Sequence, residues 1–258
     1  MPPPSRQKCY NATRSLLPIA GIGALLFGRY KSLTSSTNIA LDLFPLPLAL
    51  ATRLFDAQSN LQGWCPEKKA LWLASLVLQH KVSIALEIGI FGGRSMIPIA
   101  MAMQYAGHGE AYGIEPWSNA VATENEKDPG NLEWWSNVDL VGIKKSFLEF
   151  VCSRDLVKYV KIIEAPSDVA QTIFNSDRFR RKIELLHVDG AHNEEQALRD
   201  VKLWTEFVAD GGIVVLDDIT WPSVIPAKEY MDKTYEKLDE TIIPETNEGF
   251  ATYRITRR

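Results

Sequence analysis

The chain has 258 residues, of which 46% are hydrophobic and 23% charged, a composition typical of a soluble globular protein with one large domain. Its net charge of −4 excludes a general electrostatic attraction to nucleic acid or to an anionic membrane, so nucleic acid is not an expected partner. The three cysteines are far apart and show no paired spacing, which argues against a structural zinc site and a disulfide framework and favours the cytoplasm.

The first 65 residues are rich in proline, serine and leucine and show no clean periodicity. Their longest apolar run, residues 16–27, is too short to span a bilayer, so we predict no membrane span. We expect a loose tail and a helical cap over residues 1–65, followed by the main domain over residues 66–258.

From residue 66 onward, helical patterns alternate with short apolar runs that are typical of buried strands. Pro66 suits the first turn of a helix. The expected elements are helix 66–80, strand 82–90, helix 94–106, strand 110–117, helix 138–155, strand 157–165, helix 167–176, strand 183–189, helix 194–210, strand 212–218, helix 225–238 and strands 240–245 and 250–256.

This alternation predicts an α/β fold: a Rossmann-like, doubly wound, mostly parallel seven-stranded sheet. The strands are nearly continuous apolar runs, as expected when helices cover both faces of the sheet. The last two strands flank the short segment "TNEG", so we predict that they form an antiparallel hairpin at the edge.

A glycine-rich turn follows the first strand, in "LEIGIFGGRS". Gly89, Gly92 and Gly93 permit tight turning and close approach of the backbone to a ligand, at the sheet edge where open α/β sheets bind ligands. Glu87 stands where the dinucleotide fingerprint has a glycine, which argues against a NAD site. A purely structural turn is the alternative.

Two further strand ends carry polar residues. Glu115 ends the second strand, 28 residues after Glu87, and its carboxylate can accept two hydrogen bonds from a ribose diol. The alternative is a solvated loop acid. After the third strand, Ser167 or Asp168 either contacts an adenine or caps the next helix.

Three carboxylates follow the fourth and fifth strands: Asp189, and the pair Asp217 and Asp218. Neighbouring parallel strands end about 5 Å apart, so these groups should converge and raise one another's pKa. Mg²⁺ favours oxygen ligands and would relieve the repulsion. Capping of the following helices is the alternative role for these acids.

His192 lies three residues after Asp189, just before a helix that Asn193 is expected to cap. The positive end of the helix dipole favours the neutral imidazole, which suits a general base. A surface histidine without a role is the alternative. His187 lies within the strand, and we predict that it is structural.

The segment 117–137 is long for a connection at the ligand edge, so we predict a lid. Trp134 and Trp135 in this segment either stack on a sugar or aromatic acceptor or pack the loop down, and Trp221 is similarly placed.

Together, "LEIGIFGGRS", "YGIEPW" and "HVDGAHNEEQALRDVKLWTEFVADGGIVVLDDITW" resemble metal-dependent class I S-adenosylmethionine (SAM)-dependent methyltransferases of the sugar O-methyltransferase type, including those that tailor macrolides. The resemblance covers roughly residues 66–255. It implies that Asp189, Asp217 and Asp218 bind Mg²⁺, that His192 is the base beside Asp189, and that SAM is the methyl donor. The residues counted as cofactor-binding are Glu87, Gly89, Gly92, Gly93, Glu115, Ser167 and Asp189.

The expected reaction is methyl transfer from SAM to a hydroxyl of a small molecule, a saccharide or a glycosylated natural product. A metal-independent methyltransferase with structural acids is one alternative, and a non-catalytic cofactor-binding or scaffold protein is the other. The sequence leaves homo-oligomer formation open.

Overall fold

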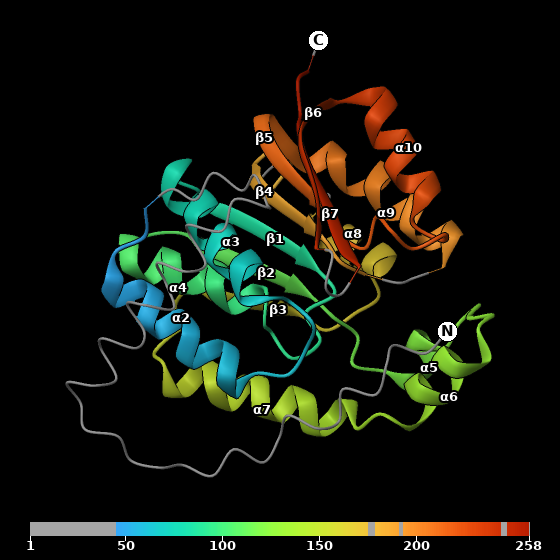
Figure 1. The fold of residues 1–258 in the computed structure, drawn as a ribbon, viewed down its shortest axis with the longest axis horizontal. Coiled ribbons are helices and arrows are strands. Elements are labelled where there is room, and N and C mark those ends of the chain that lie inside the picture. Colours follow the sequence, from blue (N-terminus) through green and yellow to red (C-terminus); the bar gives the residue numbers. More distant parts are fainter. Residues whose placement is uncertain (1–44, 175–178, 191–192, 244–246, 258) are drawn as a thin grey trace.

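The central feature of the computed structural model is a seven-stranded sheet (Figure 1). The structure describes residues 45–174, 179–190, 193–243 and 247–257. The strand order is β3-β2-β1-β4-β5-β7-β6, with the first five parallel and β7 antiparallel to both of its neighbours. The predicted fold class and edge hairpin are therefore confirmed. The strands are β1 Ile84–Ile88, β2 Glu110–Ile114, β3 Val160–Ile163, β4 Ile183–Val188, β5 Val208–Leu216, β6 Glu236–Ile243 and β7 Glu248–Arg254.

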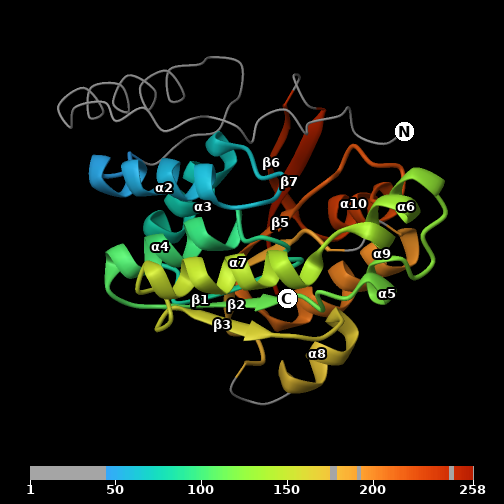
Figure 2. The same ribbon diagram turned by 90° about the horizontal axis from the view of Figure 1, so that it is seen from below.

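Helices cover both faces of the sheet (Figure 2). Alternate residues of the central strands point to opposite layers: Ala85 and Leu185 pack with α2, α3, α4 and α7, whereas Leu86 and Leu186 pack with α8, α9 and α10. The two hydrophobic cores lie between these layers. The helices are α2 Leu48–Asn60, α3 Glu67–Gln79, α4 Met96–Ala106, α5 Asn119–Ala122, α6 Pro129–Asn137, α7 Leu140–Ser153, α8 Ser167–Phe174, α9 Glu194–Trp204 and α10 Ile225–Thr234.

Two predicted helices end earlier than expected. The pattern predicts a helix through residue 210, but α9 ends at Trp204 and one 3₁₀ turn leads into β5 at Val208. Val208 pairs with Ile183 of β4, so residues 208–210 belong to the sheet although the helical pattern continues over them. Likewise, α10 ends at Thr234 because β6 begins at residue 236 and pairs with β7.

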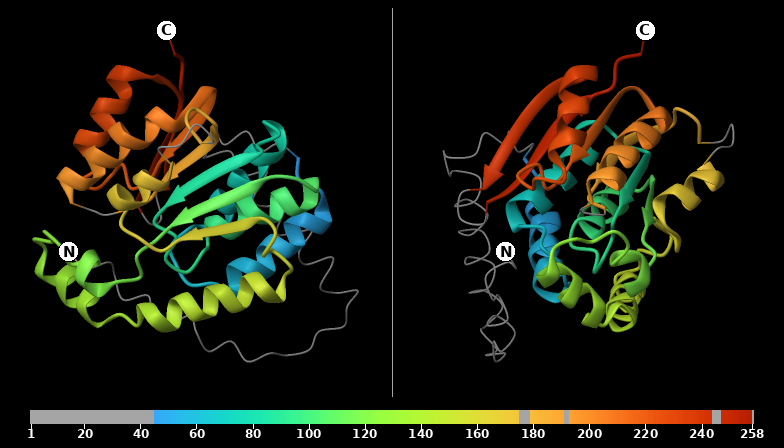
Figure 3. Two further views of the ribbon diagram at one scale, coloured as in Figure 1. Left: turned by 180° about the vertical axis from the view of Figure 1, so that it is seen from behind. Right: turned by 90° about the vertical axis from the view of Figure 1, so that its right-hand side faces the viewer.

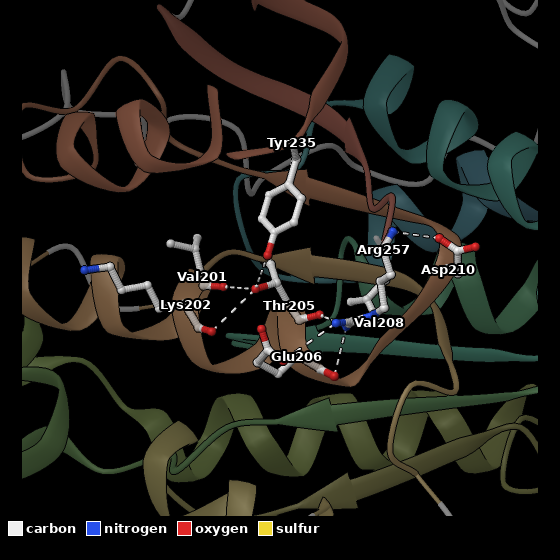
Figure 4. A network of polar contacts seen from close by, with 8 residues as sticks. All are labelled: Val201, Lys202, Thr205, Glu206, Val208, Asp210, Tyr235 and Arg257. Atoms are coloured by element: carbon white, nitrogen blue, oxygen red, sulfur yellow. Dashed lines mark hydrogen bonds and ion pairs between the residues drawn. The ribbon is translucent and has the colours of Figure 1, made fainter. Parts of the chain in front are cut away.

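At the amino end of β5, Arg257 ties three parts of the chain together (Figure 4). Its guanidinium donates hydrogen bonds to the backbone carbonyls of Thr205, Glu206 and Val208, at N–O distances of 2.7 to 3.2 Å. The Tyr235 hydroxyl donates to Thr205 Oγ1 at 3.2 Å. The end of α9, the start of β5 and the segment after β7 are thereby held by charge-assisted hydrogen bonds.

The segment before residue 66 contributes a packed helix. Leu50 and Leu54 of α2 are completely or almost completely buried and belong to the same core as α3 and α4. The predicted helix 66–80 is confirmed as α3. The boundary at residue 65 stays a prediction, and the expected tail lies outside the described residues. No helix in the described part of the chain is long and apolar enough to cross a membrane.

Candidate active site

The glycine turn lies at the carboxyl ends of β1 and β4, which are neighbours in the middle of the sheet. Gly89 has φ +89°, and a Cβ at this position would lie 1.8 Å from the carbonyl oxygen of Asp189. A Cβ at Gly92 would lie 2.4 Å from the carbonyl oxygen of Gln62, in the linker before α3. Only glycine fits such approaches, so the turn is fixed by close contact with β4 and with the α2–α3 linker. Gly93, with φ +87°, faces the ring of Phe147.

Glu115 clamps this turn from the end of β2. Its two carboxylate oxygens accept the backbone N–H groups of Phe91 and Trp117, each at 3.0 Å. The indole of Trp117 donates back to the Phe91 carbonyl at 2.8 Å. Burial raises the pKa of Glu115 and outweighs the effect of the two N–H groups. The contact with a ribose stays a prediction, while the clamp is a role that the spacing did not indicate.

Glu87 and His187 form a buried polar pair beneath the turn. Ser95 Oγ donates to Glu87 Oε1 at 2.6 Å, and Glu87 Oε2 lies 3.3 Å from His187 Nδ1. His187 Nε2 lies 3.4 Å from Asp217 Oδ2. Neither ring nitrogen of His187 nor Glu87 Oε2 has a hydrogen bond of good geometry. Because Glu87 is completely buried, its carboxylate supports the site from below rather than lining it.

The pKa of His187 reflects opposing effects. Burial and the charge of Lys69 favour the neutral ring, but the carboxylates of Asp217 and Glu87 outweigh them and raise the pKa above its ordinary value. A charged imidazolium between two carboxylates would link β1, β4 and the end of β5. His187 is thus more than the isolated strand residue that its position in the sequence indicates.

Lys69, from the first turn of α3, forms an ion pair with Asp217. The side chain of Lys69 is only 3% exposed and that of Asp217 only 12%. Burial works against the charge on both groups, but Lys69 and His187 hold the pKa of Asp217 well below its usual range. Burial lowers the pKa of Lys69, yet Asp217 and Asp189 raise it well above its usual range. A buried, charged pair therefore lies at the carboxylate edge.

Sequence reasoning missed Lys69, although a signal was present. Lys69 lies four residues before Leu73 and seven before Leu76, on the apolar stripe of α3. A lysine on such a stripe needs a buried acidic partner.

The three predicted carboxylates do converge. Asp189, Asp217 and Asp218 line one small cavity together with Asp200. Burial, followed by the charge of Asp217, raises the pKa of Asp189 well above its ordinary value. Ligand atoms of His187, Asp189 and Asp217 lie within 4.8 Å of one another, and Asp218 is not part of that group. The donor set thus differs from the predicted Asp189, Asp217 and Asp218.

This donor set does not fit a divalent cation while Lys69 holds its place. The ammonium already lies on the Asp217 carboxylate, and a dication bound there would stand next to a buried positive charge. His192, the predicted base, lies outside the described residues. The cap of the following helix is confirmed, because Asn193 Oδ1 accepts the Gln196 N–H at 2.8 Å.

Ser167 faces α9 rather than a free crevice. Its hydroxyl donates to Asp200 Oδ1 at 2.6 Å, and the amide of Gln196 donates to the same oxygen at 2.9 Å. Burial outweighs these two donors and raises the pKa of Asp200 to about 6. Asp168, the other candidate for the adenine, accepts the N–H of Val169 within its own helix. The contact with adenine stays a prediction.

The predicted lid is partly helical. Asp128 Oδ1 accepts the Asn131 N–H and Pro129 occupies the first turn, so α6 forms where a loop was expected. Helices α5 and α6 lie on the side to which β1 and β2 point (Figures 1 and 3). Trp134, 42% exposed, packs edge-on against Trp135 with ring centroids 4.7 Å apart.

Two further aromatic rings join the lid. Trp64, 44% exposed, stands 4.9 Å from Phe91 and 5.3 Å from Trp134, measured between ring centroids. Phe91 belongs to the glycine turn and Trp64 to the α2–α3 linker, so three segments meet here. We call Trp64, Phe91, Trp134 and Trp135 the aromatic cluster. Trp221, by contrast, packs against the core on the α9 face.

The fold and the order of these motifs match a known family. A family model described as a methyltransferase domain matches residues 86–219, more than half of the chain. The chain belongs to this methyltransferase family. The prediction of a class I, SAM-dependent methyltransferase is thereby confirmed, and the protein is an enzyme.

Several solved structures share the fold of this methyltransferase. The O-methyltransferase TomG from Streptomyces achromogenes, involved in tomaymycin synthesis and in complex with SAM, has a TM-score of 0.58 and 16% identity, covering 94% of this chain and 100% of its own. An O-methyltransferase from Bacillus cereus in complex with SAH has a TM-score of 0.57 and 12% identity, covering 88% of this chain and 97% of its own. The SAH-bound methyltransferase PaMTH1 from Podospora anserina has a TM-score of 0.56 and 14% identity, covering 95% of this chain and 100% of its own. No curated protein matches the chain.

Proposed function

We propose that this methyltransferase transfers the methyl group of SAM to a hydroxyl group of a small acceptor. The observation that carries the proposal is the meeting of the clamped glycine turn with Asp189, Asp217 and Lys69 at one edge of the sheet. Similar folds in proteins described as O-methyltransferases favour oxygen as the accepting atom. The cytoplasm stays a prediction from the scattered cysteines.

For the cofactor, the proposed contacts are those of the sequence prediction, adjusted to the geometry. Gly89, Gly92, Gly93 and Glu115 remain the proposed binding residues beside the turn, with Asp189 and Ser167 at the neighbouring strand ends. Glu87 supports them through Ser95 and His187. SAM supplies an electrophilic methyl group, and the chain's task is to hold oxygen, methyl and sulfur on one axis.

The proposed acceptor carries a ring with an apolar face, and a saccharide or glycosylated natural product is the preferred class. The aromatic cluster supports this proposal, because exposed indole rings stack on the apolar faces of sugars and aromatic rings alike. Its position between the glycine turn and α6 would hold such a ring close to the methyl donor.

A metal-independent reaction is favoured over the magnesium-dependent one by the ion pair of Lys69 with Asp217. Magnesium bound by Asp189, Asp217 and Asp218 would have to displace Lys69 from Asp217. His192 remains the proposed base that takes the proton of the acceptor hydroxyl, and this step needs no metal.

The test is tritiated methyl transfer from SAM to methyl glycosides in one arm and simple phenols in the other. His192→Ala should lower turnover by about 10²-fold or more with SAM affinity, measured by calorimetry, intact. His108→Ala, which removes an exposed histidine, is the matched control. Unchanged turnover in His192→Ala would remove the proposed base. Transfer to neither acceptor class, with intact SAM binding, would contradict the proposed hydroxyl acceptors.

A further inference from the structure

We propose that Lys69 takes the place of a divalent cation at the carboxylate edge, so that the chain neutralises its own acids and excludes Mg²⁺ from Asp217. The inference deepens the proposed function, because it assigns the source of positive charge beside the methyl-transfer site. It concerns a residue of α3, which lies before the 86–219 segment that matches the family.

The position of Lys69 is fixed by packing as well as by charge. Its side chain is 3% exposed, and its ammonium lies 5.4 Å from the centre of the Phe250 ring, on β7. A lysine held between an aromatic ring and a carboxylate has few other rotamers. The ammonium is therefore a resident group of the edge rather than a surface charge that bends inward.

The acids around Lys69 require a cation. Asp217 contacts it directly, a carboxylate oxygen of Asp189 lies within 4.8 Å of one of Asp217, and Glu87 reaches Asp217 through His187. Without Lys69, these buried carboxylates would repel one another, which is the condition that Mg²⁺ relieves in metal-dependent sites. With Lys69 in place, the same repulsion is relieved by a group that carries one charge and no open coordination position.

A latent metal site follows from the same geometry. Ligand atoms of His187, Asp189 and Asp217 lie within 4.8 Å of one another, a spacing that one ion could bridge once His187 has released its proton. The ammonium on Asp217 blocks this site both by contact and by repulsion. Removing the ammonium while keeping the side-chain stem should therefore open the site to a divalent cation.

The experiment measures Mn²⁺ binding by the full-length protein, from the loss of the free-ion signal in electron paramagnetic resonance. Wild type should show no saturable binding at submillimolar Mn²⁺. Lys69→Met, which keeps the contact with Phe250, should bind one Mn²⁺ about 10–100-fold more tightly than wild type. Lys69→Arg, which keeps the charge, and Lys68→Met, which removes the neighbouring lysine, should both behave like wild type.

Tight binding of one Mn²⁺ by wild type would overturn the proposal, and this result needs no variant. A folded Lys69→Met protein with no gain in affinity would overturn it as well. If Lys69→Met does not fold, the wild-type and Lys69→Arg titrations decide, because saturable binding by either contradicts the proposal and its absence in both supports it. Mn²⁺ binding is read without acceptor or turnover, so failure of the proposed methyl transfer would be seen separately.

Discussion

At the amino end of β5, the guanidinium of Arg257 donates hydrogen bonds to the carbonyls of three residues, whereas at the carboxyl end both ring nitrogens of His187 are buried without a hydrogen bond. Charged groups lie at both ends of this strand: Arg257 is only partly buried, whereas Glu87, His187 and Lys69 are buried. At the amino end, the charged guanidinium of Arg257 meets backbone carbonyl oxygens at ordinary hydrogen-bond distances. At the carboxyl end, Glu87, His187, Asp217 and Lys69 are matched mainly by charge.

The difference separates a network satisfied by hydrogen bonds from the network of the candidate site. Buried polar groups in a structural network are normally satisfied by hydrogen bonds, since an unmet group costs about 1–3 kcal/mol. Groups that keep unused donors and acceptors, as His187 and Glu87 do, are kept for another purpose or held by long-range charge. His187, Asp189 and Asp217, which lie together at this end, all have shifted pKa values, as groups in candidate functional sites often do.

The largest expected effect comes from breaking the buried ion pair. Asp217→Asn should lower the free energy of unfolding by about 3 kcal/mol or more, because the Lys69 ammonium loses its contact partner in a buried position. Urea denaturation followed by circular dichroism measures the change. The double variant Asp217→Asn with Lys69→Met should recover part of the loss. A single-variant change below about 1 kcal/mol would mean that the pair is solvated.

Asp200 refines the comparison, because it lines the same cavity as Asp189 and Asp217 but accepts two hydrogen bonds. Its pKa rises from 3.8 to about 6 in the folded state, so between these values the folded chain binds more protons than the unfolded chain. Its contribution to stability is therefore present at low pH and is lost as the pH rises to about 6.

Asp200→Asn cannot ionise and keeps an oxygen for both donors. Relative to wild type, it should gain up to about 3 kcal/mol of unfolding free energy as the pH rises from about 4 to about 6.5. Denaturation curves at several pH values measure this difference. Glu149→Gln, at an exposed position of α7, is the control. A difference between Asp200→Asn and wild type that does not change with pH would contradict the raised pKa.

The smallest effect is expected at the opposite edge. Arg257→Met should lower the free energy of unfolding by about 1–2 kcal/mol, because three carbonyls lose their charged donor and regain water only in part. SAM affinity and turnover should stay unchanged, because the residue lies at the other end of β5. Arg257→Lys should fall between wild type and Arg257→Met. A loss of SAM affinity in either variant would show that the two edges are coupled.

The parts of the fold that the sequence predicts are those with local signals. The alternation of strands and helices, the edge hairpin and the Asn193 cap each depend on neighbouring residues, and all three are confirmed. The start of β5 was misplaced because residues 205–210 continue a helical pattern, while the pairing of Val208 with Ile183 is a long-range contact.

The site could be predicted only in part, for the same reason. Asp189, Asp217 and Asp218 reach one cavity because parallel strands end at one edge, which the order of motifs already indicates. The place of Lys69 on the apolar stripe of α3 indicates a buried lysine, but its partner Asp217 is 148 positions away and cannot be identified from the spacing. The clamp formed by Glu115 on Phe91 depends on the turn geometry, and the aromatic cluster joins three segments that no motif connects.

The contact between Gly92 and the carbonyl of Gln62 has a practical consequence for anyone who trims this protein to a minimal unit. A fragment that keeps only residues 86–219, the segment that matches the family, would lose Gln62, against which the glycine turn packs. It would also lose Lys69, which pairs with Asp217, and the last two of the seven strands of the sheet, β6 and β7. Truncation should therefore stop ahead of α2, so that the linker and the turn stay in one piece.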